Sequence, residues 1–201
     1  MKDQIIQKTA ELHFKYGIKN VTMDQIANEL CISKKTIYQN FSSKLELVKQ
    51  VIDYIFEQVQ TQIDQVYLMK LNPYEELMMI ENIIKEMLGK FRYPPYLQLK
   101  KYYPEMAKNL EEKKFASMME FLEHNFKKGI KLEYYKKDLN IEFVKRLFYA
   151  GSMNVMDEHI FPSELFDKKQ TMNYFYSFFM TSISTKKGRK KLKEVTKKIK
   201  K

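Results

Sequence analysis

Lys35, Thr36, Tyr38 and Gln39 carry a varied set of hydrogen-bonding groups within one short helical pattern. At about 100° per residue, Lys35 and Gln39 lie opposite the apolar Ile37, with Thr36 and Tyr38 on the two flanks. This outer face offers donors, acceptors and a methyl group, which are the groups that recognise base edges in the major groove of DNA. The alternative interpretation is an ordinary solvated polar face.

Other reactive side chains are scattered along the chain. His13, His124 and His159 lack metal-ligand spacing with Cys31 or with acidic residues. We find no glycine-rich phosphate loop, nucleophile elbow or pair of catalytic carboxylates. We therefore predict that the chain is not an enzyme and uses no cofactor or metal ion. For His13 we expect a position in the core or at its boundary with its polar atoms hydrogen-bonded, and a ligand or pH-sensing role is the alternative.

The polar face belongs to a stretch with two helix starts, VTMDQIANELCISKKTIYQNF at residues 21–41. Thr22 and Gln25 form a capping box, and Ser33 is a good N-cap for the second helix. Residues 31–33 form a short turn between the two helices. The stretch therefore predicts a helix-turn-helix whose second helix presents the polar face.

Two helix starts in this region could bind phosphate. Ser43 and Glu46 form another capping box, which puts Lys44 in a first turn, where the helix dipole disfavours a cation. A phosphate there would reverse this penalty, because it would accept hydrogen bonds from backbone N–H groups and from Lys44. Thr22 marks a second such start. The stretch DQIIQKTAELHFKYG, residues 3–17, predicts an amphipathic helix that precedes both.

The composition favours an all-α protein. Among 201 residues there are five Gly, five Pro and no Trp, and the abundant Leu, Met, Lys, Glu and Phe favour helices over strands. The single Cys31 excludes an internal disulfide and fits a reducing cytosol. No apolar run is long enough for a secretory signal or a membrane span. We predict a cytoplasmic all-α protein of about nine to ten helices, without a membrane span.

The formal net charge of +11 is concentrated at the C-terminal end. Residues 186–201, KKGRKKLKEVTKKIKK, carry ten Lys or Arg and one Glu, whereas the first 49 residues carry eight Lys and five acids. We expect this segment to be a basic tail or an amphipathic helix that docks only marginally. It also supports an alternative function, a non-specific helical protein that binds DNA or an anionic surface through its Lys-rich tail.

Residues from about Ile5 to Val48 resemble the N-terminal DNA-binding domain of TetR-family transcriptional regulators. The resemblance rests on A-x-L at residues 10–12, Gly17, VTMDQIA, ISKKTIYQNF and SKLELV. It implies an all-α homodimer with a three-helix helix-turn-helix domain and a larger effector domain. It also implies a sequence-specific repressor, which binds double-stranded operator DNA and is released by an unknown small-molecule effector.

The resemblance further implies contacts with operator DNA at eight positions: Thr22, Ser33, Lys34, Lys35, Thr36, Tyr38, Gln39 and Lys44. We expect Tyr38 and Lys44 to hold phosphates, whereas Lys35, Thr36 and Gln39 should meet bases.

Two positions depart from the family pattern. Cys31 stands where Gly commonly begins the turn between the helices, so we expect a turn that is less left-handed or slightly strained. His13 stands where Phe commonly packs in the first helix. Neither departure removes an expected DNA contact.

Further helical patterns follow this domain, with breaks at Pro94–Pro95 and at Pro104. The predicted helices cover residues 43–71, from 72 towards Pro94, 105–128 with a stop at Gly129, 141–158, and from 163 or 167 to 184. We divide the chain into a helix-turn-helix domain at 1–48, a ligand-binding and dimerisation domain at 49–185, and the basic segment at 186–201.

The family analogy implies two further features of the effector domain. Helices 141–158 and 167–184 should form a four-helix dimer interface, to which Ala150, Gly151 and Ser152 would allow a close approach. A small-molecule pocket is expected among adaptable apolar and polar side chains, for which ordinary core packing is the alternative. The candidates are Met87, Tyr102, Met118, Phe121, Asn125 and Met153.

Overall fold

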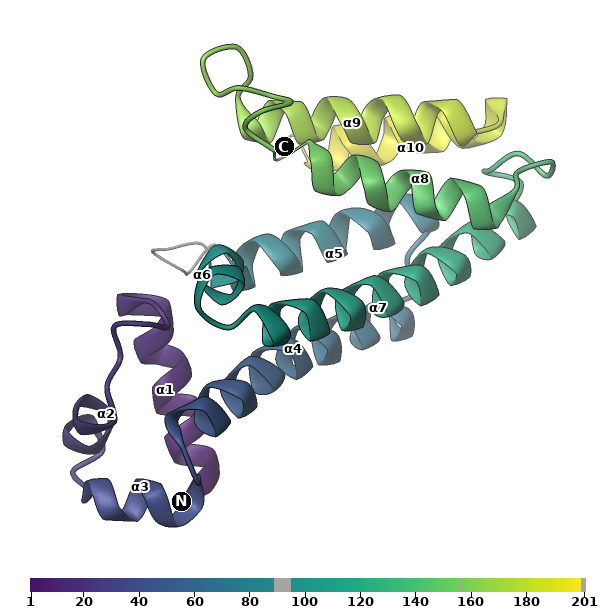
Figure 1. The fold of residues 1–201 in the computed structure, drawn as a ribbon. Coiled ribbons are helices and arrows are strands. Elements are labelled where there is room, and N and C mark those ends of the chain that lie inside the picture. The colour runs from purple at the N-terminus through teal and green to yellow at the C-terminus, as the bar shows by residue number, and fades with distance from the viewer. Residues whose placement is uncertain (89–94, 156, 200–201) are drawn as a thin grey trace. The chain divides into compact units, whose positions relative to one another are not determined.

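The computed structural model of the chain describes residues 1–88, 95–155 and 157–199 (Figure 1). Every regular element in these ranges is an α-helix, which confirms the all-α prediction and the expected number of helices. The ten helices are α1 (Lys2–Tyr16), α2 (Met23–Glu29), α3 (Lys34–Asn40), α4 (Lys44–Leu68), α5 (Pro73–Leu88), α6 (Pro95–Tyr102), α7 (Pro104–Lys131), α8 (Ile141–Asn154), α9 (Lys168–Ile183) and α10 (Lys186–Ile199).

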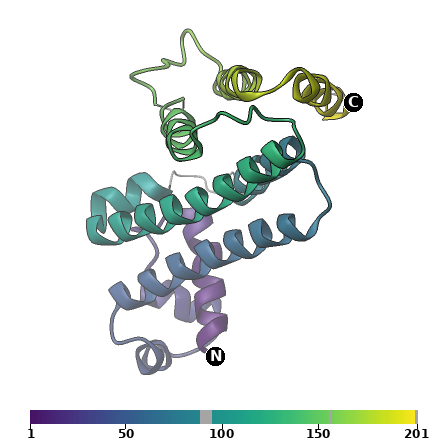
Figure 2. The same cartoon turned by 90° about the vertical axis from the view of Figure 1, so that its right-hand side faces the viewer.

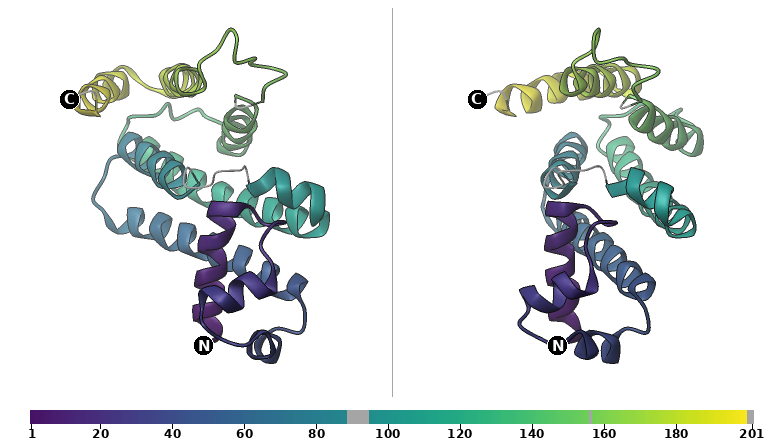
Figure 3. Two further views of the ribbon diagram at one scale, coloured as in Figure 1. Left: turned by 90° about the vertical axis from the view of Figure 1, so that its left-hand side faces the viewer. Right: turned by 60° about the vertical axis from the view of Figure 1, so that its left-hand side comes forward.

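Residues 1–69 and 79–113 form one compact unit. In it α1 packs against both α2 and α4, and α2 packs against α3 (Figure 3). The shared core includes Ile5 from α1, Ile26 from α2, Ile37 from α3 and Val51 from α4, each at most 1% exposed. Helices as short as α2 and α3 are unstable alone in water, so this common core is what holds them in place.

The same unit includes α6 and the first turns of α7. Leu99 of α6 is fully buried and packs in one apolar cluster with Ile18 and Ile52. The Gln98 side-chain oxygen accepts a hydrogen bond of 2.8 Å from the backbone N–H of Ile18. Helix α6 is therefore in direct contact with the segment that joins α1 to α2.

Residues 70–78 and 114–201 form the second compact unit. The ring of Tyr135 meets the rings of Tyr74 and Phe126 edge to face, with centroids 5.3 and 5.8 Å apart. Helices α8 and α9 pack side by side (Figure 2), where the rings of Phe148 and Phe179 lie 5.1 Å apart. Aromatic contacts thus form much of this core.

A buried polar network crosses the core of the second unit. Glu76 is fully buried, and its carboxylate pairs with the Lys128 ammonium group. The Asn125 amide donates to the same carboxylate at 2.9 Å and to the Pro73 carbonyl at 2.8 Å. Its oxygen accepts from the Tyr135 hydroxyl at 3.2 Å. A buried charge is tolerated only when it is paired and hydrogen-bonded in this way.

The predicted helix end at Gly129 is wrong, because α7 continues through it to Lys131. A Cβ atom at Gly129 would lie only 2.1 Å from a ring carbon of Tyr135. Glycine is therefore required here for the close approach of an aromatic ring, and not to end the helix. The ring belongs to a residue six positions further along the chain, in the loop after α7.

Gly151 likewise has a role within the chain. A Cβ atom there would lie 2.3 Å from the ring of Phe175, so the glycine lets α9 approach α8 in the same molecule. Ser152 is also buried, whereas Ala150 is exposed. Of the three small residues expected at a dimer interface, only Ala150 therefore presents its side chain outward. Helix α8 itself ends at Asn154 rather than near residue 158.

The C-terminal segment is helical, and Gly188 lies inside α10 rather than before it. Val195 of this helix is 2% exposed, so α10 is docked more firmly than the sequence suggests.

Residues 200–201 and the predicted break at Pro94 lie outside the described residues. Over the described ranges, none of the helices combines the length and the apolar character needed to cross a membrane.

Candidate nucleic-acid interface

Helix α3 is fixed by a cap at its start and by two apolar anchors. The Ser33 hydroxyl accepts a hydrogen bond of 3.0 Å from the backbone N–H of Thr36. Ile37 is fully buried, and Phe41, which follows the helix, is 1% exposed. Because both anchors face the core, the orientation of α3 about its own axis is set, and the opposite side must face solvent.

The predicted base-reading side chains lie on that solvent side. Lys35 and Gln39 are exposed, and Tyr38 is 47% exposed. Thr36 is partly buried, and its hydroxyl lies 2.8 Å from the hydroxyl of Ser33, with which it shares a hydrogen bond. The structure thus brings cation, amide, phenol and hydroxyl together on one exposed face of α3.

The turn between α2 and α3 retains a left-handed residue without glycine. Cys31 has a φ of 53°, a conformation that costs a non-glycine residue about 1–2 kcal/mol. Of the two expected consequences of this cysteine, the strained turn is the one observed. Its thiol is exposed and forms no disulfide. Helix α2 starts at the predicted cap, where the Thr22 hydroxyl accepts from the Gln25 backbone N–H at 3.1 Å.

Lys34 forms an ion pair that the sequence did not indicate. Its ammonium group lies 2.8 Å from the carboxylate of Asp24, which is on α2. The hydrogen bond with Asp24 and the charge of that carboxylate raise the pKa of Lys34. Ten positions separate the two residues, so only the packing of α2 against α3 brings them together.

Lys44 is partly buried at the start of α4, and burial lowers the pKa of its ammonium group. That group donates a long hydrogen bond of 3.3 Å to the carbonyl of Lys19. The Ser43 hydroxyl accepts from the Glu46 backbone N–H at 3.1 Å, as the capping box predicts. The Glu46 carboxylate, however, accepts from the backbone N–H of Ser42 at 2.6 Å instead of from Ser43.

His13 lies in the core, at 1% exposed, as expected for this position. Burial and then the nearby positive charge of Lys44 lower the pKa of its imidazole from 6.5 to about 4. Its Nδ1 atom is buried and has no hydrogen-bond partner among the described residues, so the expectation that its polar atoms are hydrogen-bonded is wrong. The imidazole is therefore neutral at pH 7, and it belongs to the core side of α1, not to the exposed face of α3.

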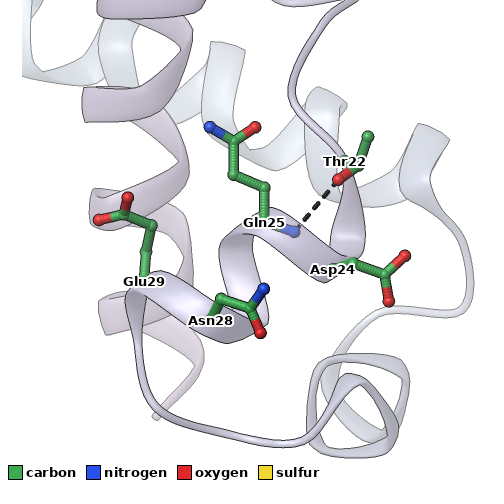
Figure 4. Close-up of a pocket in the computed structure, with 5 residues that line it drawn as sticks. All are labelled: Thr22, Asp24, Gln25, Asn28 and Glu29. Carbon is green, nitrogen blue, oxygen red and sulfur yellow. Dashed lines mark hydrogen bonds between the residues drawn. The ribbon is translucent and has the colours of Figure 1, made fainter.

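A shallow hollow on the surface of α2 is lined by Thr22, Asp24, Gln25, Asn28 and Glu29 (Figure 4). Two of these side chains are carboxylates, which would repel a phosphate. Among the predicted DNA contacts only Thr22 borders the hollow. Across the described part of the chain, no group of three or more His, Cys, Asp and Glu side chains could hold a metal ion.

The candidate ligand-binding residues are divided between the two units. In the first unit, the Met87 sulfur accepts from the Gln62 amide at 3.4 Å, and Tyr102 is 36% exposed with the Lys19 ammonium 4.5 Å from its ring centre. In the second, Asn125 is fully engaged in the buried network. The remaining three are Met118 and Phe121 on α7, of which Phe121 is 2% exposed, and Met153 on α8, which is 44% exposed.

Comparison with known proteins identifies relatives of the domain and of the fold. Residues 5–51 match the family model described as "Bacterial regulatory proteins, tetR family", which confirms the resemblance. A search of curated proteins found no match.

The fold of the chain also occurs in solved transcriptional regulators. A TetR-family regulator from Cytophaga hutchinsonii is 18% identical with a TM-score of 0.70, over 92% of this chain and 95% of that one. A second regulator from Cytophaga hutchinsonii is 20% identical with a TM-score of 0.72, over 91% and 98%. The fatty acid degradation regulator FadR from Bacillus halodurans is 16% identical with a TM-score of 0.64, over 90% and 98%. The chain thus combines the N-terminal domain of the tetR family with the all-α fold of TetR-family regulators.

Proposed function

We propose that this chain, which carries a tetR-family DNA-binding domain, is a sequence-specific transcriptional repressor that a small-molecule ligand releases from its operator. The observation that supports this most is the exposed face of α3. Its cation, amide, phenol and hydroxyl groups project from a helix whose inner side is anchored by Ile37 and Phe41. A capped, rigid helix of this kind can enter the major groove without reorganising.

The proposed contacts divide by chemistry. Lys35, Thr36 and Gln39 meet base edges, because they project from the exposed side and the flank of α3. Tyr38 and Lys44 hold phosphates, together with the hydroxyls of Thr22 and Ser33 at their helix starts. Phosphate binding at Lys44 suits a group that is already partly desolvated and that, among the described residues, makes a single long hydrogen bond.

Lys34 would exchange partners on binding. Its ion pair with Asp24 is exposed on both sides, and solvent screening makes the contribution of such a pair to stability small. A DNA phosphate can therefore replace the carboxylate with little loss of free energy. The pair would hold the Lys34 side chain in place at the start of α3 while the protein is free of DNA.

We also propose that the repressor is a homodimer formed through α8 and α9. Phe143 and Leu147 are spaced four residues apart on α8 and are 61% and 50% exposed. Tyr174 and Phe178 repeat this spacing on the adjacent α9 and are 62% and 77% exposed. An isologous contact between two such faces would remove these large apolar side chains from water. The helix-turn-helix domains of the two copies could then bind half-sites about 34–36 Å apart.

The proposed ligand site involves the candidate residues named above, of which Met118 and Phe121 lie close together on α7. Phe121 is 2% exposed and lies three residues from Met118 on α7, so both side chains are on one side of that helix. A ligand lowers the affinity of the protein for the operator only if it binds the DNA-free conformation more tightly than the DNA-bound one.

We place the activity in the cytoplasm, where DNA and a reduced Cys31 coexist.

Selection of genomic DNA fragments by the purified full-length protein tests this function. We expect enrichment of a short palindromic sequence, whose half-sites are one helical turn apart. A variant in which both Lys35 and Gln39 are replaced by Ala should remain folded and dimeric but should not enrich it. Retention of unrelated fragments in proportion to their length alone would contradict the proposal and favour a non-specific basic binder.

A further inference from the structure

Four lysines of α10 form a straight row on its solvent side. Lys186, Lys190, Lys193 and Lys197 recur at intervals of four, three and four residues, which places them within about 60° of one another around the helix. All four are exposed. At a rise of about 1.5 Å per residue, this lysine row extends along about 16 Å of the helix axis.

The opposite side of α10 is packed into the second unit. Val195 lies about 180° from the row and is 2% exposed. A Cβ atom at Gly188 would lie 2.0 Å from the carbonyl oxygen of Tyr134, so α10 approaches the backbone there. The Gly188 backbone N–H also donates to the Thr185 hydroxyl at 3.0 Å. These contacts fix the rotation of the helix and hold the lysine row outward.

No salt bridge among the described residues neutralises the row. In the described residues, the salt bridges of α10 join Lys187 to Glu133 and Lys191 to Glu194, and neither lysine is in the row. The first turn of the helix has no acidic residue, although the helix dipole disfavours cations there. The lysines also repel one another at four-residue spacing. This arrangement lowers the stability of α10 unless an anionic partner binds it.

We propose that the lysine row of α10 is a second nucleic-acid contact, which binds the phosphate backbone of double-stranded DNA without reading its bases. Lysine suits this role, because its ammonium group is a point charge on a flexible stem and makes few directional demands. A linear array of cations can neutralise successive phosphates and release their condensed counterions. The proposal goes beyond operator recognition, which depends on α3.

DNA fits the row better than a membrane surface does. A helix that lies in a lipid interface inserts its apolar face among the acyl chains. The apolar side of α10 is already occupied, since Val195 and Gly188 pack against the second unit. The outward side carries only charged side chains between Lys186 and Lys197, so it offers no apolar anchor to a bilayer.

The test replaces the four row lysines by Gln in the full-length protein and measures affinity for scrambled duplex DNA across a range of salt concentrations. We expect the slope of log affinity against log salt to flatten by about three to four for each copy whose row contacts the DNA, because each phosphate that is no longer neutralised reduces it by about 0.9. Operator preference over scrambled DNA should be unchanged. A Lys190→Gln, Lys193→Gln variant should give about half of the flattening, which keeps the test valid if the fourfold variant folds poorly.

The matched control replaces Lys70, Lys131, Lys137 and Lys169 by Gln. These lysines are exposed in the same unit, take part in none of the salt bridges of the described residues, and give the same change in net charge. Equal flattening in the control would overturn the proposal, because the effect would then be one of overall charge. An unchanged affinity of the row variant for scrambled duplex DNA would overturn it as well. So would a variant that loses affinity for anionic lipid vesicles but not for DNA.

The two proposals fail separately. If the wild-type protein does not prefer any operator, the proposed function is wrong, while binding to scrambled duplex still reports on the row. If the row variant loses operator preference while it remains folded and dimeric, the row takes part in recognition, and a base-independent contact is excluded.

Discussion

Single side chains at the start of α4 show how burial prepares a group for a ligand. Lys44 is partly desolvated, and burial lowers its pKa, while its hydrogen bond to the carbonyl of Lys19 is long at 3.3 Å. Its positive charge also lowers the pKa of the nearby His13. A phosphate at this position would compensate for the lost hydration of the ammonium group and would meet the free N–H groups of the first turn.

Replacement of Lys44 by Ala should therefore weaken binding to every DNA sequence by a similar factor. We expect the salt dependence to decrease by about one phosphate contact, or about 0.9 in the slope of log affinity against log salt. Titration of operator and scrambled duplexes at several salt concentrations measures both effects. Lys49→Ala, an exposed lysine on the same helix, is the control. A loss confined to the operator would show that Lys44 acts in base recognition.

His13 should make the stability of the first unit depend on pH. Burial and the charge of Lys44 lower its pKa from 6.5 to about 4, so the unfolded chain binds a proton more readily than the folded one. The free energy of unfolding is therefore highest above pH 6.5. It decreases as the pH falls towards 4, by about 3 kcal/mol at most. Urea unfolding between pH 7 and 4 should show this slope, and His13→Phe should reduce it. An identical slope in the variant would contradict the low pKa.

At the scale of elements, the helix-turn-helix depends on caps at both helices and on a turn under strain. Ser33 caps α3 at 3.0 Å and Thr22 caps α2 at 3.1 Å, while Cys31 holds the left-handed position between them. The strain arises from the backbone of Cys31, where φ is 53°, and the thiol itself is exposed. Glycine would adopt this conformation without penalty.

Cys31→Gly should thus raise the free energy of unfolding by about 1 kcal/mol, the approximate cost of a left-handed non-glycine residue. Cys31→Ala removes the same thiol but keeps the Cβ atom, so it is the matched control and should not stabilise the protein. Denaturant midpoints of the three proteins measure the difference. If the Ala variant were stabilised as much as the Gly variant, the thiol rather than the backbone would be the cause.

The same elements explain which features could be predicted from sequence. The starts of α2, α3 and α4 were predictable, because a cap depends on residues only three positions apart. The polar face of α3 followed from the helical period and the position of Ile37. Gly129 misled the prediction, since its role depends on a ring from the following loop, and the Lys34–Asp24 pair required knowledge of the packing. Neither contact has a local signature in the sequence.

At the scale of the whole molecule, operator binding as proposed involves two copies of the chain. One helix-turn-helix domain makes few contacts with DNA. When two such domains are linked, binding of the first raises the effective concentration of the second at its half-site, so the affinity increases. The apolar pairs on α8 and α9 supply a surface that a second copy would cover, and Phe178 is its most exposed member at 77%. Gly151 allows the ring of Phe175 to approach α8, so the two helices that carry these pairs are closely packed in one copy.

Phe178→Glu should dissociate the dimer, because an isologous contact would bury two unpaired carboxylates, one from each copy. Light scattering after gel filtration should report half the wild-type mass, and operator affinity should fall by at least about a hundredfold, because the avidity of two linked heads disappears. The control is Lys169→Glu, which changes charge at an exposed position on the same helix. A dimeric Phe178→Glu protein would place the interface elsewhere.

The most direct test of the central claim, that the exposed face of α3 reads bases, is a complete set of affinities for operators with single base changes. These are measured for the wild-type protein and for Gln39→Ala at one salt concentration. We predict that the variant loses discrimination of about 1–3 kcal/mol at one base-pair position in each half-site and keeps its preferences elsewhere. A variant that is weaker by one constant factor on every operator, or unchanged on all of them, would contradict base reading by Gln39.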